Sequence, residues 1–102
     1  MTKKEENWAY FTKNHRDIFK AYSEFGKALH TVGGPLDEKQ RWLIKVAVSA
    51  AGKHELALKT HVEKARTAGC TNPEIEHAIL LTATTAGFPT MMNALMVFRE
   101  ML

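Results

Sequence analysis

Two histidines, His54 and His61, have the side-chain chemistry and the spacing of a working site. They lie seven residues apart in "HELALKTH". Seven helical residues make nearly two turns, so both rings would lie on almost the same face, about 10.5 Å apart along the axis. A metal ion needs its ligand atoms at about 2 Å, so this spacing predicts no metal site within one chain. A small substrate would instead have room to lie between the two rings.

The stretch begins like the zinc-protease motif HExxH, but Leu58 stands where that motif needs its second histidine. His54 falls in the first turn of the predicted helix, where the positive end of the helix dipole disfavours protonation of the ring. A neutral His54 can act as a base or as a hydrogen-bond acceptor. On spacing alone, a partly exposed surface histidine remains the alternative for both His54 and His61.

These side chains need helices to position them, and the sequence predicts an all-α chain. Gly and Pro gather at only a few places, and no run alternates polar and apolar residues with the period of a strand. Asp37 with Gln40 predicts a capping box, and Gly52 and Gly69 are typical helix ends. Five helices are predicted: Glu5 to about Leu29, a second that ends at Ala51, His54 to Ala68, a fourth capped by Thr71 or Asn72, and a fifth that follows "AGFP".

Two of these helices carry more apolar surface than one small chain can hide. In the first, large apolar residues recur every three or four positions with His15 filling a gap, as in a coiled-coil seam. The seam residues are Trp8, Phe11, Ile18, Tyr22, Phe25 and Leu29, and the last helix carries Met91, Met92, Leu95, Met96 and Phe98. A methionine stripe forms either core or a flexible ligand surface. We predict that part of this apolar surface lies between the subunits of a homo-oligomer.

Length and composition favour one globular domain, residues 1–102. Hydrophobic residues make up 45 % and charged residues 25 %, which is too apolar for a disordered chain. The net charge of +3 arises from Lys and Arg interleaved with Glu and Asp, so no nucleic-acid partner is predicted. Polar residues interrupt the longest uncharged run, 78–98, and the N-terminus has no apolar signal core. No membrane association is therefore predicted, and a cytoplasmic location is expected.

Several features, each common alone, occur in a specific order between Leu36 and Leu95. They are a Leu-Asp-x-Lys-x-Arg opening, the run "LIKVAVSAA", a histidine followed by Ala65 and by Ala68-Gly69, an x-x-Glu-Ile start, and "AGFPTMMNA". In this order and spacing the segment resembles the carboxymuconolactone decarboxylase family, which also contains the alkylhydroperoxidase D-like proteins. The resemblance implies a helical fold and an oligomer, often a hexamer built as a trimer of dimers.

The departures from the family pattern decide which chemistry the resemblance implies. In the thiol-dependent branch a glutamate and a CxxC pair act with the histidine. Trp42, His54 and Ala57 stand at those three places here, and only His61 matches. Cys70, the single cysteine, lies after the helix. The resemblance therefore does not imply a CxxC peroxidase.

The decarboxylase branch also lacks the cysteines and keeps the histidine, and Glu55 is the candidate match for a glutamate that precedes it. This branch implies decarboxylation of a small lactone or carboxylic acid by proton transfer, with no cofactor. His61 would be the acid/base, with His54 or Glu55 assisting. Arg41 or a nearby lysine would hold the carboxylate, and Trp42 would line the pocket. A solvated charge and a buried aromatic ring are the alternatives for those last two residues.

Two functions are consistent with these observations. One is a carboxy-lyase-like enzyme that needs neither cofactor nor metal and acts on a small molecule. The other is a noncatalytic oligomer that binds small molecules and has lost the thiol peroxidase site. An apolar pocket beside His61, with a second titratable group in reach, would favour the enzyme.

Overall fold

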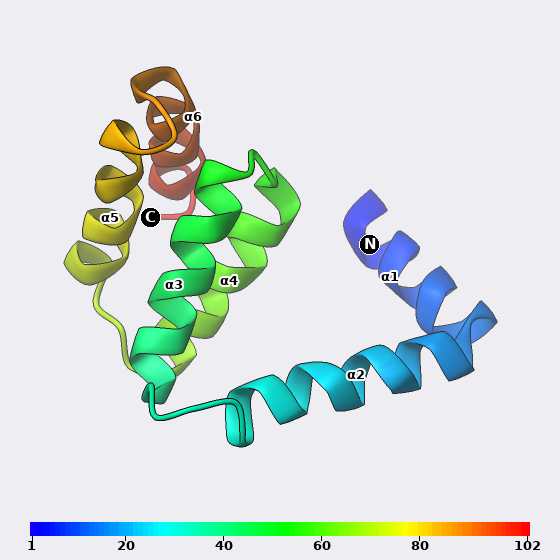
Figure 1. Cartoon of the computed structure of the whole chain (residues 1–102). Helices are drawn as coiled ribbons and strands as arrows, with labels where there is room; N and C mark the ends of the chain where they lie inside the picture. The colour runs from blue at the N-terminus through cyan, green and yellow to red at the C-terminus, as the bar shows by residue number, and fades with distance from the viewer. The chain divides into compact units, whose positions relative to one another are not determined.

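The structure, a computed structural model, describes residues 1–102, and its regular elements are all helical. The predicted all-α fold is confirmed. Two compact units divide the chain, 1–35 and 36–102 (Figure 1). In chain order the elements are α1 (Lys3–Asn14), α2 (Arg16–Thr31), α3 (Glu38–Ala51), α4 (Glu55–Thr67), α5 (Asn72–Leu80), the 3-10 helix η1 (Leu81–Thr84) and α6 (Phe88–Arg99).

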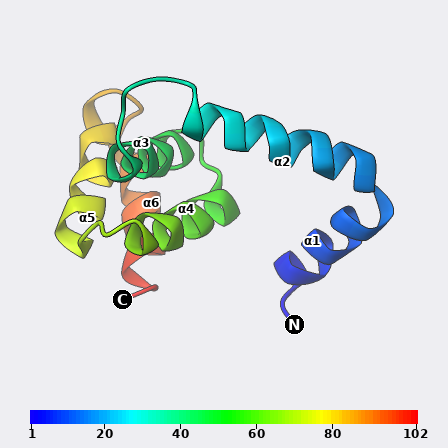
Figure 2. The same ribbon diagram turned by 90° about the horizontal axis from the view of Figure 1, so that it is seen from below.

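The first unit corrects the expectation of a single helix from Glu5 to Leu29. That segment breaks at His15, whose φ of −129° and ψ of 54° are not helical, so α1 and α2 meet in a bend (Figure 2). Just before the bend, the amide of Asn14 donates to the carbonyl of Tyr10 at 2.9 Å. Such side-chain bonds compete with the helical backbone pattern and favour an end at this point.

The bend lets aromatic rings from the two helices pack on each other. The ring of Trp8 meets that of Phe19 edge to face at 5.4 Å, and Phe11 meets the same ring at 6.2 Å. Offset and edge-to-face pairs of this kind add to the free energy of simple burial. No residue of α1 or α2 is fully buried within the chain, however. The apolar face of α2 stays exposed, as its large side chains show: Ile18, Tyr22, Phe25 and Leu29.

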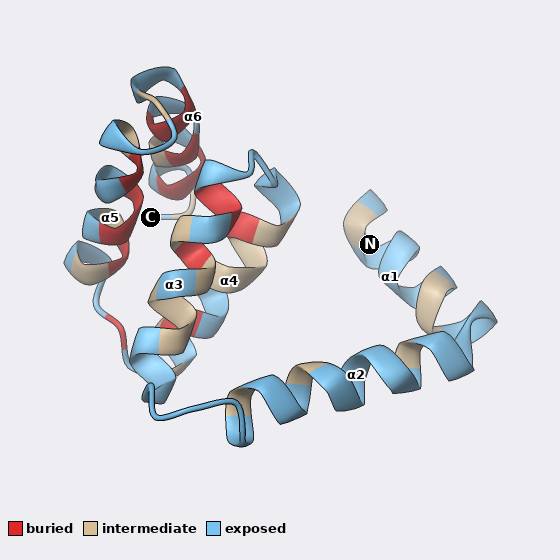
Figure 3. Ribbon diagram, viewed as in Figure 1, coloured by how far each residue is buried: buried red, intermediate tan, exposed pale blue.

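The second unit contains the core. α3 and α4 form a hairpin through the short turn at Gly52 and Lys53, and both α5 and α6 pack against α3. The buried residues of these helices form one core cluster, and Figure 3 marks their positions along the ribbons in red. The largest fully buried ones are Phe98, Leu58, Ile75, Ile79, Val46 and Val62. Whether the two units unfold as the one domain expected from length stays a prediction.

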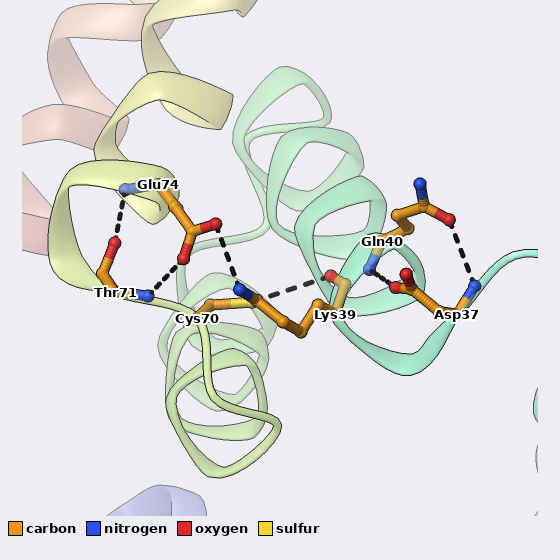
Figure 4. A network of polar contacts seen from close by, with 6 residues as sticks. All are labelled: Asp37, Lys39, Gln40, Cys70, Thr71 and Glu74. Carbon is orange, nitrogen blue, oxygen red and sulfur yellow. Dashed lines mark hydrogen bonds and ion pairs between the residues drawn. The ribbon is translucent and has the colours of Figure 1, made fainter.

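Local signals set the helix ends of the second unit as predicted. Asp37 and Gln40 form a capping box at the start of α3, and Thr71 rather than Asn72 caps α5. Figure 4 shows both boxes. Gly69 follows α4 with a φ of +96°, a left-handed conformation that suits glycine. These caps determine where α3 and α5 begin and where α4 ends.

The last helix divides the predicted methionine stripe. Met91 is buried in the core, whereas Met92 and Met96 are 45 % and 55 % exposed. The stripe therefore contributes to the core on one side and to the surface on the other. "AGFP" separates the helices as expected, with the short η1 added before it.

Candidate functional site

His61 lies on α4 where that helix packs against α3, and two acceptor groups of α3 surround its Nδ1 atom. Nδ1 is within hydrogen-bond reach of the Ser49 hydroxyl and lies 3.2 Å from the carbonyl oxygen of Lys45. The Ser49 hydroxyl itself donates to the same carbonyl at 2.7 Å. Ser49 is only 3 % exposed, so this arrangement sits inside the helix pair.

The three contacts define which nitrogen of His61 carries hydrogen in the neutral ring. The Lys45 carbonyl can only accept, and the hydroxyl hydrogen of Ser49 is already directed at it. This arrangement assigns Nδ1 as the donor, to the Ser49 oxygen and to the carbonyl. In a neutral ring the basic lone pair then lies on Nε2. Ser49 and the Lys45 carbonyl hold the imidazole in one tautomer and one orientation.

Trp42 forms a wall beside the same imidazole. Its ring centroid lies 5.9 Å from that of His61, at an interplanar angle of 43°. Trp42, Lys45 and Ser49 are three and four residues apart on α3, so they share one face of that helix. Trp42 is half-buried and also packs against the core. The predicted pair of His61 and Trp42 is thus brought together.

His54 and Glu55 lie on a different side of Ser49. Both line a cavity of about 280 Å³ between α3, α4 and α6, and Ser49 forms part of its wall. His54 is the N-cap residue of α4. A Cβ atom on Gly52 would come within 2.7 Å of the His54 ring, so glycine at this turn gives the ring room. The nitrogen of His61 that touches Ser49 is Nδ1, so Nε2 is the atom that does not face this wall.

Arg41 takes part in the start of α3. Its guanidinium Nη1 donates to the carbonyl of Leu36 at 2.6 Å, which ties the chain before the helix to its first turn. The side chain is half-buried. A role for Arg41 in holding a substrate carboxylate stays a prediction.

Cys70 lies at the opposite end of α3 from Ser49. Its thiol is buried and lies 3.7 Å from the carbonyl of Lys39, ten residues before Ser49 (Figure 4). Ten helical residues span about 15 Å. Burial first, and then the nearby carboxylate of Glu74, raise the pKa of the Cys70 thiol. This thiol is thus remote from His61 and held in its neutral form.

Ser49 is the site residue that the sequence reading missed. The signal was present, because Ser49 is a polar residue near the end of the apolar run "LIKVAVSAA" and falls on the buried face of the helix. Its partner His61 is twelve residues away, so the pair needs the turn between α3 and α4 to form.

No three His, Cys, Asp or Glu side chains come together in a way that could hold a metal ion. None of the helices combines the length and the apolar character that crossing a membrane requires.

Comparison with known proteins gives a match that covers most of the chain. No match was found among curated proteins or among solved structures. The family model described as "Carboxymuconolactone decarboxylase family" matches residues 16–100. The match includes α2 and every helix of the second unit, a longer segment than residues 36–95 that carry the motifs. The chain therefore belongs to the carboxymuconolactone decarboxylase family.

Proposed function

We propose that this protein is a cofactor-independent, decarboxylase-like enzyme that acts on a small lactone or carboxylic acid, with His61 as the acid/base. The observation that carries the proposal is the setting of Nδ1. Two acceptors from α3 orient the imidazole and leave Nε2 as its basic atom. A general acid/base needs such orientation, and an unperturbed histidine titrates close to neutral pH.

The proposed step balances without an external oxidant or reductant. The bond between the carboxylate carbon and the neighbouring carbon breaks, CO₂ leaves, and the electron pair stays on that carbon. The protonated Nε2 of His61 donates its proton to that carbon, and the ring is reprotonated from water. Nδ1–H keeps its hydrogen bonds to α3 through both states, so the ring does not reorient between steps.

The neighbouring residues take supporting parts in this proposal. Trp42, whose ring lies beside the imidazole, is proposed to supply an apolar wall that limits water at the ring. Arg41, which also donates to the carbonyl of Leu36, is proposed to hold the carboxylate. His54 and Glu55 were expected to assist His61, and in the proposal they act only on a ligand in the cavity of α3, α4 and α6.

The test compares His61 with the residue that orients it, on a substrate found in a panel of small lactone acids. His61→Ala should keep the fold and lower turnover by roughly 10²–10⁴-fold, the range for one general acid/base. Ser49→Ala should lower turnover about 10-fold and broaden the pH dependence of turnover. Contacts that orient a functional side chain have effects of this size. Ser49→Thr, which keeps a hydroxyl, should restore most of the loss. Full turnover by His61→Ala would remove the assignment.

A noncatalytic, oligomeric small-molecule-binding protein is the second candidate. It is favoured by the tryptophan at the place of the thiol branch's glutamate, because the Trp42 ring packs on His61 and carries no charge for a relay. Binding of panel compounds without any release of CO₂ would support this candidate. In both cases we propose a trimer-based or hexameric homo-oligomer. A cytoplasmic location also stays a prediction, to be tested by cell fractionation.

A further inference from the structure

The cavity between α3, α4 and α6 has a polar rim above an apolar floor. Its polar lining includes Lys53, His54, Thr90 and Asn93, and its volume is about 280 Å³. We propose that this cavity binds a small monocarboxylate, at a site separate from the basic nitrogen of His61.

The size and floor of the cavity limit the ligand to a compact molecule. A volume of 280 Å³ equals that of about nine water molecules in the liquid and lies just below the usual range for ligand pockets. The floor is apolar and comes from buried side chains of all three helices, and the exposed Met96 also lines the cavity. The floor residues are Ala50, Leu58, Ala94 and Val97. An acid with a short apolar chain matches this combination of size and floor.

The rim formed by the α3–α4 turn favours negative charge. Lys53 has a φ of +59°, a conformation that costs free energy for a residue with a side chain. Hydrogen bonds from Lys53 N to Ala50 O and from His54 N to Ser49 O hold this turn. The turn places Lys53 at the cavity, next to the first turn of α4, whose N-cap His54 makes no side-chain capping bond. The dipole of a 13-residue helix adds positive potential there.

Glu55 is the one acidic residue of the cavity lining, and another lysine partly compensates it. Its carboxylate lies 3.8 Å from the ammonium of Lys59, one turn later on α4. The charge of Lys53 therefore remains available for a ligand rather than for Glu55.

α6 supplies hydrogen-bond donors on the other wall. Thr90 is 8 % exposed, yet its hydroxyl makes no hydrogen bond in the structure, whereas the equally buried Thr82 donates to the carbonyl of Ile79. No buried side-chain oxygen of the chain lacks a partner, so the Thr90 hydroxyl is open to the cavity and can donate to a ligand or to water there. Asn93 follows Thr90 by three residues on the same wall. These two groups complete a site with a cationic rim and neutral donors.

The site is independent of the acid/base proposed above. The wall between them is Ser49, which presents its hydroxyl to Lys45 and to Nδ1 of His61. The ligand would therefore bind without contact to Nε2, and loss of the His61 ring should not abolish binding.

The experiment titrates the full chain with lactate and levulinate and follows the backbone and side-chain amides by NMR. Their neutral amides, lactamide and levulinamide, are the matched controls. Binding in the millimolar range is expected for such small ligands, corresponding to about −4 kcal/mol. Shifts should map to the first turn of α4 and to the side-chain amide of Asn93. The neutral amides should bind at least about fivefold more weakly, because they lack the charge.

Variants separate the site from the catalytic proposal. Lys53→Asn, which tolerates a positive φ, and the isosteric Thr90→Val should each weaken lactate binding about fivefold. His61→Gln, and Lys64→Gln at an exposed lysine of α4 outside the cavity lining, should leave it unchanged. Equal binding of acids and neutral amides, shifts centred on Trp42, or no shift up to about 50 mM ligand would each overturn the proposal. The comparison of acids with amides on the unaltered chain holds even if a variant misfolds.

Discussion

Cys70 illustrates how one side chain can be structural in a family that also contains thiol enzymes. The thiol is 6 % exposed and contacts the carbonyl of Lys39. Burial raises its pKa from the ordinary value of 9.0, so the reactive thiolate is disfavoured at neutral pH. With no second cysteine in the chain, it cannot form an internal disulfide.

We predict that Cys70→Ser keeps the fold and any turnover, with a loss of about 1 kcal/mol in the free energy of unfolding. In the unaltered protein, a thiol reagent should react on the order of a hundredfold more slowly than in denaturant, because local opening must come first. Urea unfolding and labelling kinetics measure the two effects. Rapid labelling of the folded protein, or peroxide turnover lost with the thiol, would contradict this view of Cys70.

Among the helices, α5 depends on a charged group at its first turn. The Glu74 carboxylate accepts from the backbone N–H of Thr71 at 2.8 Å and lies 3.2 Å from the ammonium of Lys39 (Figure 4). The backbone hydrogen bond from Thr71, followed by the contact with Lys39, lowers the pKa of Glu74 below its ordinary 4.5. The start of α5 and that of α3 are thus linked through one carboxylate.

Because of this link, we predict that the free energy of unfolding decreases at acidic pH. Because the pKa of Glu74 is lower in the folded chain, its contribution is full above 4.5 and is lost as the pH falls through the folded value. Glu74→Gln keeps the capping box but cannot titrate, so its stability should change less between neutral pH and about pH 3 to 4. Urea unfolding followed by circular dichroism measures this. The difference should shrink in high salt, since the ion pair with Lys39 is half-exposed. An identical acid profile for both proteins would count against the link.

At the scale of the whole molecule, the chain exposes more large apolar side chains than its own helices bury. The face of α2 stays exposed within the chain, and so do Met92 and Met96 of α6. A second apolar groove of about 470 Å³ on α3, α5 and η1 is bordered by the exposed Ile44, Val48 and Leu81. Exposed apolar faces of this kind, each taken by itself, mark contact sites between proteins. A second copy of the chain is their expected cover.

We predict a particle several times the 11.5 kDa chain mass, in keeping with a trimer-based or hexameric assembly. Phe25→Glu should dissociate it, because the glutamate would lie in the middle of the apolar face of α2. Ser23→Glu adds the same charge about 130° around the helix from that face and is the matched control. Light scattering at micromolar concentration measures both. A monomeric unaltered chain would refute the assembly.

The sequence alone was sufficient wherever the structure depends on neighbours three or four residues apart. The capping box of Asp37 and Gln40, the Thr71 cap and the end of α4 before Gly69 all follow from local hydrogen bonds and backbone preferences. The order of the family motifs along the chain likewise made His61 the candidate acid/base, which stays a prediction. The sequence does not predict the break at His15, because the apolar period continues through it. The aromatic contacts that stabilise the bend form between residues of separate helices.

The site itself depends on packing between helices. Ser49 and His61 are twelve residues apart, and only the turn after α3 brings the hydroxyl onto Nδ1 and determines which nitrogen is basic. The same turn places His54 on the other side of Ser49, although a single helical face would have kept the two histidines together. Spacing along one helix gives side-chain direction, but cavities and hydrogen-bond partners come from the neighbouring helices. The sequence therefore sufficed to propose His61 as the candidate, whereas the assignment of its tautomer required the packing of α4 against α3.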